Sequence, residues 1–169
     1  MIIYQLNPAA RNLEITVNDG TDAISGATVT IGTDSETTGD DGKCTFELDD
    51  GTYDISVTKT GYADGSSSVT INGSDTTKTI SLTIVDTISF TIDDGENPIQ
   101  GATVVIGETT KTTGSSGGCT FPNMAYDTYS ATISATGYTT ATESIEFDAE
   151  HKSFTISLES ATTEGEGGG

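Results

Sequence analysis

Short stretches of alternating apolar and polar residues recur along most of the chain. Residues 13–17, 27–31, 53–57 and 154–158 each place an apolar side chain at every second position. A period of two over five residues predicts a β-strand with one face on a core and the other in water. The most helix-like patch, residues 147–151, is short and is better interpreted as a turn. The pattern therefore predicts an all-β fold.

Dipeptides that favour turns separate these stretches. They are Asp-Gly at 19–20, 41–42, 50–51 and 94–95, and Asn-Gly at 72–73. The sequence also contains 33 threonines, whose branched side chains favour strands. About seven short strands fit into each half of the chain at the spacing of a β-sandwich.

The chain repeats itself over its whole length. The motif Gly-Ala-Thr-Val at 26–29 recurs at 101–104, and Gly-x-Cys-Thr-Phe at 42–46 recurs 75 residues later at 117–121. After one inserted residue, Thr-Tyr and Gly-Tyr recur at a spacing of 76, from 52–53 to 128–129 and from 61–62 to 137–138. A period this long corresponds to a whole domain and not to a solenoid unit.

We therefore predict two tandem seven-stranded Ig-like β-sandwich domains. Repeat 1 covers residues 13–85 and repeat 2 covers residues 86–160, with an N-terminal arm at 1–12 and a flexible tail at 161–169. The junction at 83–87 has no Gly or Pro, which predicts a stiff connection.

Charge excludes several classes of partner. The chain has 26 acidic and 6 basic residues, a formal net charge of −20. The basic residues form no stripe, which argues against nucleic-acid binding. An anionic membrane surface would repel the chain, and no stretch approaches the roughly 20 apolar residues of a membrane span. The first residues lack a basic n-region, so we expect no cleaved signal peptide.

Residues able to support catalysis are scarce. His151 is the one histidine, and it stands in a turn without a partner for a hydrolytic triad. The cysteines have no zinc-binding spacing, and no phosphate-binding glycine motif occurs. We therefore expect no enzyme activity and no catalytic residues. Cys44 and Cys119 occupy equivalent places in the two repeats, so we expect two free, half-buried thiols.

Calcium is the one cofactor that the acidic turns suggest. Asp34, Glu36, Asp40 and Asp41 could approach one another across a turn, but no run matches an EF-hand loop. Repeat 2 has serines at 115–116 in place of the last two of these acids, whereas a site kept by the duplication would survive in both copies. We expect solvated carboxylates with ordinary pKa values, no metal and no cofactor.

The order of motifs resembles the carboxypeptidase regulatory-like domains of the transthyretin-like and CnaB-like group. The resemblance rests on Gly-Ala-Thr-Val, on Thr-Thr-Gly followed by Cys-Thr-Phe, and on Thr-Tyr followed by Gly-Tyr, in both repeats. It implies a seven-stranded sandwich that serves as a stalk, spacer, surface-display, glycan-contacting or virion-decoration module. Some CnaB-like domains join a first-strand Lys to a last-strand Asn. The first strands here contain no Lys and the last strands no Asn, so we expect no such crosslink.

Three functions are consistent with this sequence. The first is a non-enzymatic virion structural protein, a bacteriophage capsid decoration or fibre-like protein made in the host cytoplasm. The second is a cell-surface or extracellular filament, stalk or adhesin module. The third is contact with a host-surface glycan. In the first two, the partners are other proteins of a multi-copy virion or surface assembly. In the first, the N-terminal arm is the attachment segment through its apolar residues Ile2, Ile3, Tyr4, Leu6 and Pro8; the alternative is that the arm packs on repeat 1.

Overall fold

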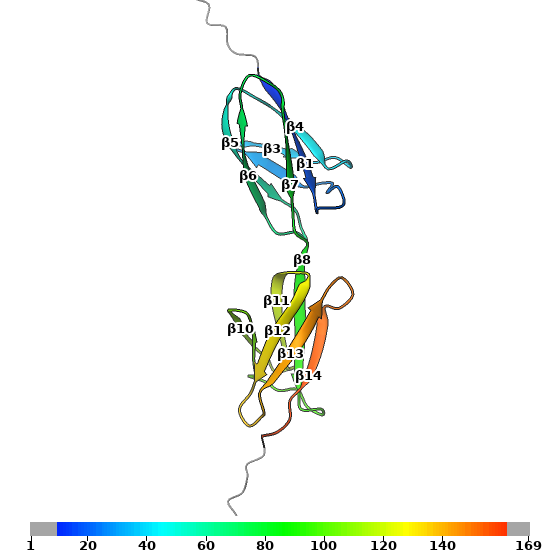
Figure 1. Cartoon of the computed structure of the whole chain (residues 1–169). Coiled ribbons are helices and arrows are strands. Elements are labelled where there is room, and N and C mark those ends of the chain that lie inside the picture. Colours follow the sequence, from blue (N-terminus) through cyan, green and yellow to red (C-terminus); the bar gives the residue numbers. More distant parts are fainter. Residues whose placement is uncertain (1–9, 162–169) are drawn as a thin grey trace, which may run out of the picture. The chain divides into compact units, whose positions relative to one another are not determined.

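A computed structural model of the chain describes residues 10–161. Contacts divide the chain into two compact units, Met1–Ile84 and Val85–Gly169. Each unit contains seven strands, and no helix occurs within residues 10–161 (Figure 1). The predicted all-β fold with two seven-stranded sandwiches is confirmed. The predicted attachment residues Ile2, Ile3, Tyr4, Leu6 and Pro8 lie outside the described residues, as does the tail from residue 162.

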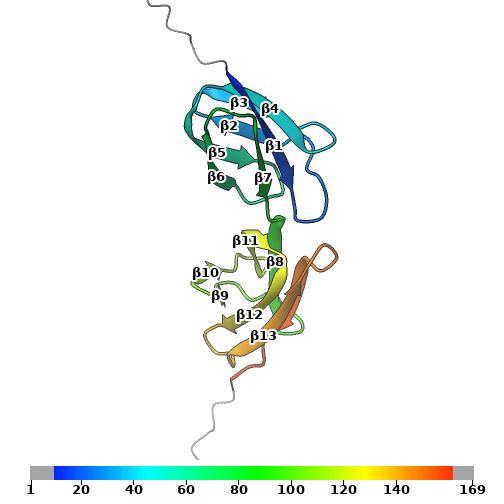
Figure 2. The same cartoon turned by 45° about the horizontal axis from the view of Figure 1, so that its top comes forward.

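The first unit consists of a three-stranded and a four-stranded sheet. In the smaller sheet, β1 (Arg11–Asn18) runs antiparallel to β4 (Lys43–Leu48) on one side and parallel to β7 (Thr76–Ser81) on the other. The larger sheet is antiparallel and has the order β3-β2-β5-β6 (Figure 2). Its strands are β2 (Thr28–Ile31), β3 (Asp34–Thr37), β5 (Gly51–Thr58) and β6 (Gly65–Ile71).

The second unit repeats this topology strand for strand. Its smaller sheet places β8 (Val85–Asp93) between β11 (Gly118–Ala125), antiparallel, and β14 (Ser153–Ser157), parallel. Its larger sheet has the order β10-β9-β12-β13. The strands of that sheet are β9 (Thr103–Ile106), β10 (Thr109–Thr112), β12 (Asp127–Ser134) and β13 (Ala141–Phe147).

The cores are built from the alternating positions that the sequence pattern marked. In β1 the side chains of Leu13, Ile15 and Val17 are fully buried, while the residues between them face outward. In the second unit Phe90 is buried at the equivalent strand, and its ring meets that of Phe121 edge to face at 5.8 Å. Each unit therefore has a hydrophobic core of its own.

A buried threonine connects two segments of each sandwich. The Thr38 hydroxyl donates to the carbonyl of Ile24 at 2.7 Å and accepts from the amide of Ala27 at 2.9 Å. Thr113 makes the same two hydrogen bonds, at 2.6 and 2.9 Å, in the second unit. These two threonines are the buried polar residues of the described chain. They hold the turn before β2 or β9 against the residue that follows β3 or β10.

The one-residue insertion in the second repeat forms a β-bulge. The register of β11 against β8 shifts between Phe121 and Met124. Asn123 lies in this bulge with a φ of 58°, and it is the one residue other than glycine with a positive φ among those described. The bulge accounts for the change of repeat spacing from 75 to 76.

Candidate functional site

The acidic turns that precede Gly20 and Gly95 are structural. The Asp19 carboxylate accepts hydrogen bonds from the amides of Thr21 at 3.0 Å and Asp22 at 2.7 Å. Asp94 accepts from the amides two and three residues ahead at the same distances. These backbone donors lower the pKa of both carboxyl groups. The expectation of ordinary pKa values was wrong here, because the sequence did not show that the carboxylates close their own turns.

The acidic turn around Asp40 and Asp41 is also occupied by local contacts. Asp40 accepts from the Ser25 hydroxyl at 3.2 Å, and Asp41 accepts from the Lys43 amide at 3.1 Å. Between residues 10 and 161 no group of three or more His, Cys, Asp or Glu side chains is placed to hold a metal ion.

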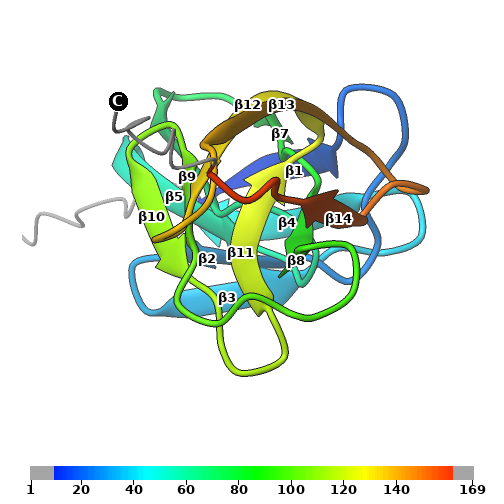
Figure 3. The ribbon, with the colours of Figure 1, turned by 90° about the horizontal axis from the view of Figure 1, so that it is seen from below.

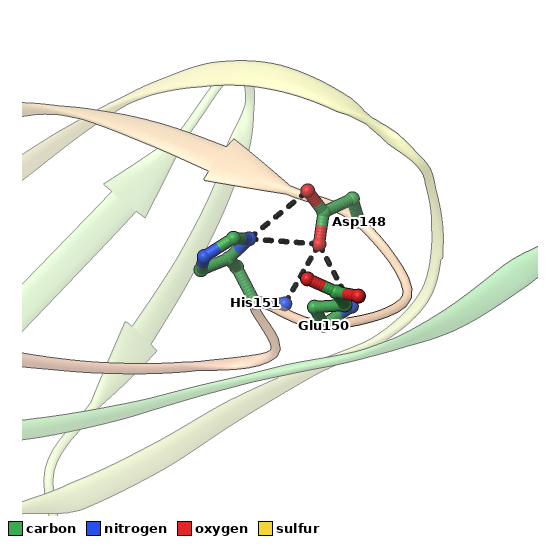
Figure 4. A network of polar contacts seen from close by, with 3 residues as sticks. All are labelled: Asp148, Glu150 and His151. Atoms are coloured by element: carbon green, nitrogen blue, oxygen red, sulfur yellow. Dashed lines mark hydrogen bonds and ion pairs between the residues drawn. The ribbon is translucent and has the colours of Figure 1, made fainter.

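The single histidine belongs to a compact polar network between β13 and β14 (Figure 4). The Asp148 carboxylate accepts from the amides of Glu150 and His151 at 2.8 and 2.7 Å, and it lies 2.9 Å from the imidazole Nδ1. The imidazole and the two amides lower the pKa of Asp148 to about 2. The same carboxylate raises the pKa of His151. Both side chains are solvent-exposed. Because the contacts of Asp148 are all with residues 150 and 151, the network closes the predicted turn in which His151 stands.

Both cysteines are free thiols, as predicted. Cys119 is half-buried, whereas Cys44 is 8% exposed and is therefore more buried than expected. Burial raises the pKa of Cys119, and burial together with the charge of Glu36 raises that of Cys44 to about 11. Thiols with such raised pKa values are poor nucleophiles at neutral pH.

The tyrosines of the two Thr-Tyr motifs anchor strand starts. The Tyr53 hydroxyl donates to the carbonyl of Asp49 at 3.0 Å, and the Tyr129 hydroxyl donates to that of Ala125 at 2.8 Å. Both rings pack against the core of their own unit. Hydrogen bonding to backbone four residues upstream is typical of the tyrosine corner of Ig-like sandwiches.

Ion pairs connect the first strand of each unit to a lysine in, or just before, a neighbouring strand. Lys43 lies 2.8 Å from Glu14 on the outer face of the first unit, and Lys152 lies 2.5 Å from Asp86 in the second. The observed first strands, β1 and β8, contain no Lys, and the last strands, β7 and β14, contain no Asn. The residue types that a CnaB-like crosslink uses are thus missing from the observed strands as well.

Two surface grooves lie within residues 10–161, one in each unit. The first, of about 410 Å³, is lined by Gly26, Lys59, Asp64 and three threonines. No aromatic ring is among these described lining residues, so this groove lacks the flat platform on which a sugar ring stacks. The second, of about 270 Å³, lies between the start of β13 and the end of β14, where Ala141, Glu143 and Leu158 line it.

Comparison with known protein families finds one match. The sequence model of the carboxypeptidase regulatory-like domain matches residues 12–84. A search of curated protein sequences finds no significant match. No described helix is long and apolar enough to cross a membrane.

Several solved structures are similar at low identity. A streptococcal ancillary pilin is 14% identical over 92% of this chain, with a TM-score of 0.42. The Bacillus anthracis TIE protein is 16% identical over 90%, with a TM-score of 0.39, and the shaft pilin SpaA from Lactobacillus rhamnosus GG is 14% identical over 90%, with a TM-score of 0.42. The chain spans 63% of the streptococcal pilin, 34% of the Bacillus protein and 98% of SpaA. Similarity at this level transfers no function.

The motifs quoted from the sequence and the match over residues 12–84 identify the same domain family. The second unit has the same strand order, the same pairings and the same buried threonine. Residues 12–84 of the first unit therefore match the carboxypeptidase regulatory-like domain, and the second unit repeats the same Ig-like fold.

Proposed function

We propose that this chain is a non-enzymatic structural module, carried in many copies by a bacterial cell-surface or extracellular filament assembly. One observation carries the proposal: the features that the duplication keeps are those that hold a sandwich together. The buried threonine, the turn closed by Asp19 or Asp94 and the tyrosine corner occur in both units at equivalent positions. Chemistry present in only one copy, such as the Asp148–His151 network, closes a turn.

The distribution of charge supports display in many copies. The outer faces of the two four-stranded sheets carry almost only hydroxyl side chains, with Asp54 as the charged group on one face and Glu146 on the other. In the first unit these hydroxyl residues are Thr28, Thr30, Ser35, Thr37, Thr52, Ser56, Thr58, Ser66, Ser68 and Thr70. Many acids stand instead in the turns, where their side chains are exposed. High net charge at the turns keeps neighbouring copies soluble and discourages indiscriminate association.

The arm before β1 is the proposed attachment segment. It carries Ile2, Ile3, Tyr4, Leu6 and Pro8, and residues 1–9 contain no charged side chain in a chain of net charge −20. β1 begins at Arg11, inside the predicted arm, and the amide of Asn12 donates to Asp75 at 2.9 Å. A deletion that tests attachment must therefore stop at residue 9, so that β1 stays intact.

The proposal is tested in a strain that makes this protein, with antibodies against the folded units. We expect immunogold label in multiple copies on the cell surface or on filaments, and we expect deletion of residues 1–9 to remove the label while the purified variant melts at an unchanged temperature. Label confined to the cytosol would contradict the surface placement. A deletion variant that still decorates the surface would contradict the role of the arm.

A virion decoration protein is the second candidate. The specific observation in its favour is the pair of free thiols, since proteins made in a reducing compartment keep cysteines unpaired. The same antibodies decide between the candidates. Label on purified phage particles, and none on uninfected cells, supports the virion; label on uninfected cells supports the surface assembly.

A further inference from the structure

The last strand of the second unit, β14, is an open sheet edge whose own five residues lack the features that usually protect such edges; the nearest charge, Lys152, precedes the strand and is paired with Asp86. It pairs with β8 on one side, and no described strand lies on its other side (Figure 3). Its five residues, Ser-Phe-Thr-Ile-Ser, include no charge, no proline and no bulge. Natural proteins protect edges with these features because an unprotected edge pairs with other chains.

The duplication supplies an internal comparison for this edge. In the first unit the equivalent strand β7 carries Lys78 at the position of Phe154, and an inward-pointing lysine is a standard protection of an edge. The other edge of the same sheet differs as well. In the second unit, β11 is interrupted by Pro122 and by the bulge at Asn123. The smaller sheet of the second unit is therefore blocked at β11 and open at β14.

The core-facing side chains of β14 leave apolar surface to be covered. Phe154 and Ile156 are half-buried and pack on the core, and the Phe154 ring lies 5.8 Å from that of Phe90. In the first unit the equivalent of Ile156 is Ile80, which is 5% exposed. An added strand beside β14 would bury the exposed parts of both side chains.

The groove next to β14 lies where the second unit has alanine and the first unit has glycine. In the first unit a Cβ on Gly65 would overlap the end of the Leu82 side chain, so β6 and the residue after β7 pack more closely than an alanine at position 65 would allow without a shift of that side chain. The second unit has Ala141 at that position, opposite Leu158. The groove of about 270 Å³ opens at this place, between β13 and the end of β14.

We infer that β14 of one copy accepts residues 2–7 of the arm of a second copy as an added strand. This inference rests on the proposed role of the arm. Ile2, Tyr4 and Leu6 alternate with Ile3, Gln5 and Asn7, so a strand would place three apolar side chains on the core side, beside Phe154 and Ile156. Backbone pairing supplies the affinity and the alternating side chains supply the specificity.

Length and charge also favour this occupant. Six residues cover a five-residue strand, and Pro8 ends the pairing where the arm must turn away. The arm has no acid to be repelled by Glu143 and Glu159 at the groove, whereas the C-terminal residues 162–169 carry two glutamates and four glycines. An arm that enters the next copy, whose own arm enters another, makes a heterologous contact that propagates into a filament.

The first experiment locates the arm on the full chain. Tyr4 is replaced by the photoreactive p-benzoyl-phenylalanine, equal amounts of natural-abundance and nitrogen-15-labelled protein are mixed and irradiated, and tryptic peptides are identified by mass spectrometry. Trypsin cuts after Lys152, so β14 lies in a peptide of its own, residues 153–169. We expect mixed-isotope crosslinks to that peptide. Crosslinks only within one copy, crosslinks to other strands, or no crosslinks would each overturn the inference.

A pair of lysine substitutions then tests the edge. Phe154→Lys gives β14 the lysine that β7 has at the equivalent position, Lys78. We expect this variant to reduce the crosslink at least about tenfold, because an added strand would bury the unpaired charge of the lysine. Thr79→Lys adds the same charge to the outer face of β7 and should leave the crosslink unchanged. Equal crosslinking in both variants contradicts the β14 site.

Recovery of the native assembly separates the two proposals. If deletion of residues 1–9 abolishes incorporation and F154K does not, the arm attaches elsewhere: the proposed function stands and the β14 site fails. If both abolish incorporation, both are supported. If the deletion variant is still incorporated, the arm is not the attachment segment and the proposed function itself fails.

Discussion

Replacing Thr38 by valine tests the buried threonine that occurs in each unit. Valine keeps the shape of the side chain and removes the hydroxyl. The carbonyl of Ile24 and the amide of Ala27 then lose a buried partner at 2.7 and 2.9 Å. A stranded buried polar group costs about 1–3 kcal/mol, so we expect T38V to destabilise its unit by about 2–4 kcal/mol.

That cost is large compared with the stability of one unit. At roughly 0.05–0.15 kcal/mol per residue, a unit of about 75 residues is stable by about 4–11 kcal/mol. Thr113→Val should have an effect of the same size on the second unit, where Thr113 makes the equivalent bonds. Thr45→Val, on the exposed outer face of β4, is the matched control and should stay within about 0.5 kcal/mol.

Urea unfolding followed by two-dimensional NMR of the full chain reads out each unit separately through its own amide signals. For T38V we expect the midpoint of residues 10–84 to fall by roughly 2–4 M, given a urea dependence of about 1 kcal/mol/M for a unit of this size. The reasoning is refuted if T38V lowers that midpoint no more than T45V does.

Further predictions concern a glycine, the histidine and the cysteines. Gly117→Ala should lower the free energy of unfolding by at least about 2 kcal/mol, because the φ of Gly117 is 72° and a Cβ there would overlap the carbonyl oxygen of Ile92. Gly95→Ala, where a Cβ would meet no atom within 4 Å, is the control and should lower it by about 1 kcal/mol. Thermal unfolding measures both. The lowered pKa of Asp148 stabilises the fold above the ordinary carboxyl pKa, and this contribution is lost as pH falls through about 2. The raised pKa of His151 stabilises the fold fully below about pH 6.5, and this contribution is lost as pH rises through the raised pKa. NMR titration should therefore show the His151 pKa falling toward about 6.5 in D148N, and no change would contradict the network. At pH 8 a thiol with a pKa of about 11 is present as thiolate about a hundredfold less often than an ordinary thiol. Cys44 should therefore react with Ellman's reagent about a hundredfold more slowly in the folded protein than in urea. Equal rates would show that Cys44 is not buried.

Much of the fold was predictable because the same motifs and alternating stretches occur in both halves of the sequence. Period-two alternation marked β1, β2, β5 and β14, and the repeat spacing showed that two units share one topology. Gly42 and Gly117, which begin the repeated Gly-x-Cys-Thr-Phe motif, both have a positive φ, at 73° and 72°. The unpaired state of the cysteines also followed from sequence.

The polar contacts inside the turns were not predictable from alternation. Thr38 and Thr113 stand just outside strands in a Thr-Thr-Gly motif, where a threonine usually faces water. The recurrence of this threonine at a spacing of 75 residues was the signal that the sequence offered. Only the folded structure shows that its hydroxyl bonds to two backbone groups. The same holds for Asp19, whose lowered pKa depends on amides two and three residues ahead.

The contrast between the two copies also needed the structure. Lys78 and Phe154 look like ordinary surface and core variants until both are placed on the open edge of a sheet. Likewise, the exchange of Gly65 for Ala141 becomes meaningful only beside the leucine that each faces.

The central claim is that two structural sandwiches are held in a multi-copy assembly by the segment before β1. The most direct measurement compares how much full-length protein and how much of a variant lacking residues 1–9 is incorporated into the native assembly, with the melting temperature of both recorded. The account predicts that incorporation is lost while the melting temperature is unchanged. Undiminished incorporation of the shortened protein would contradict it.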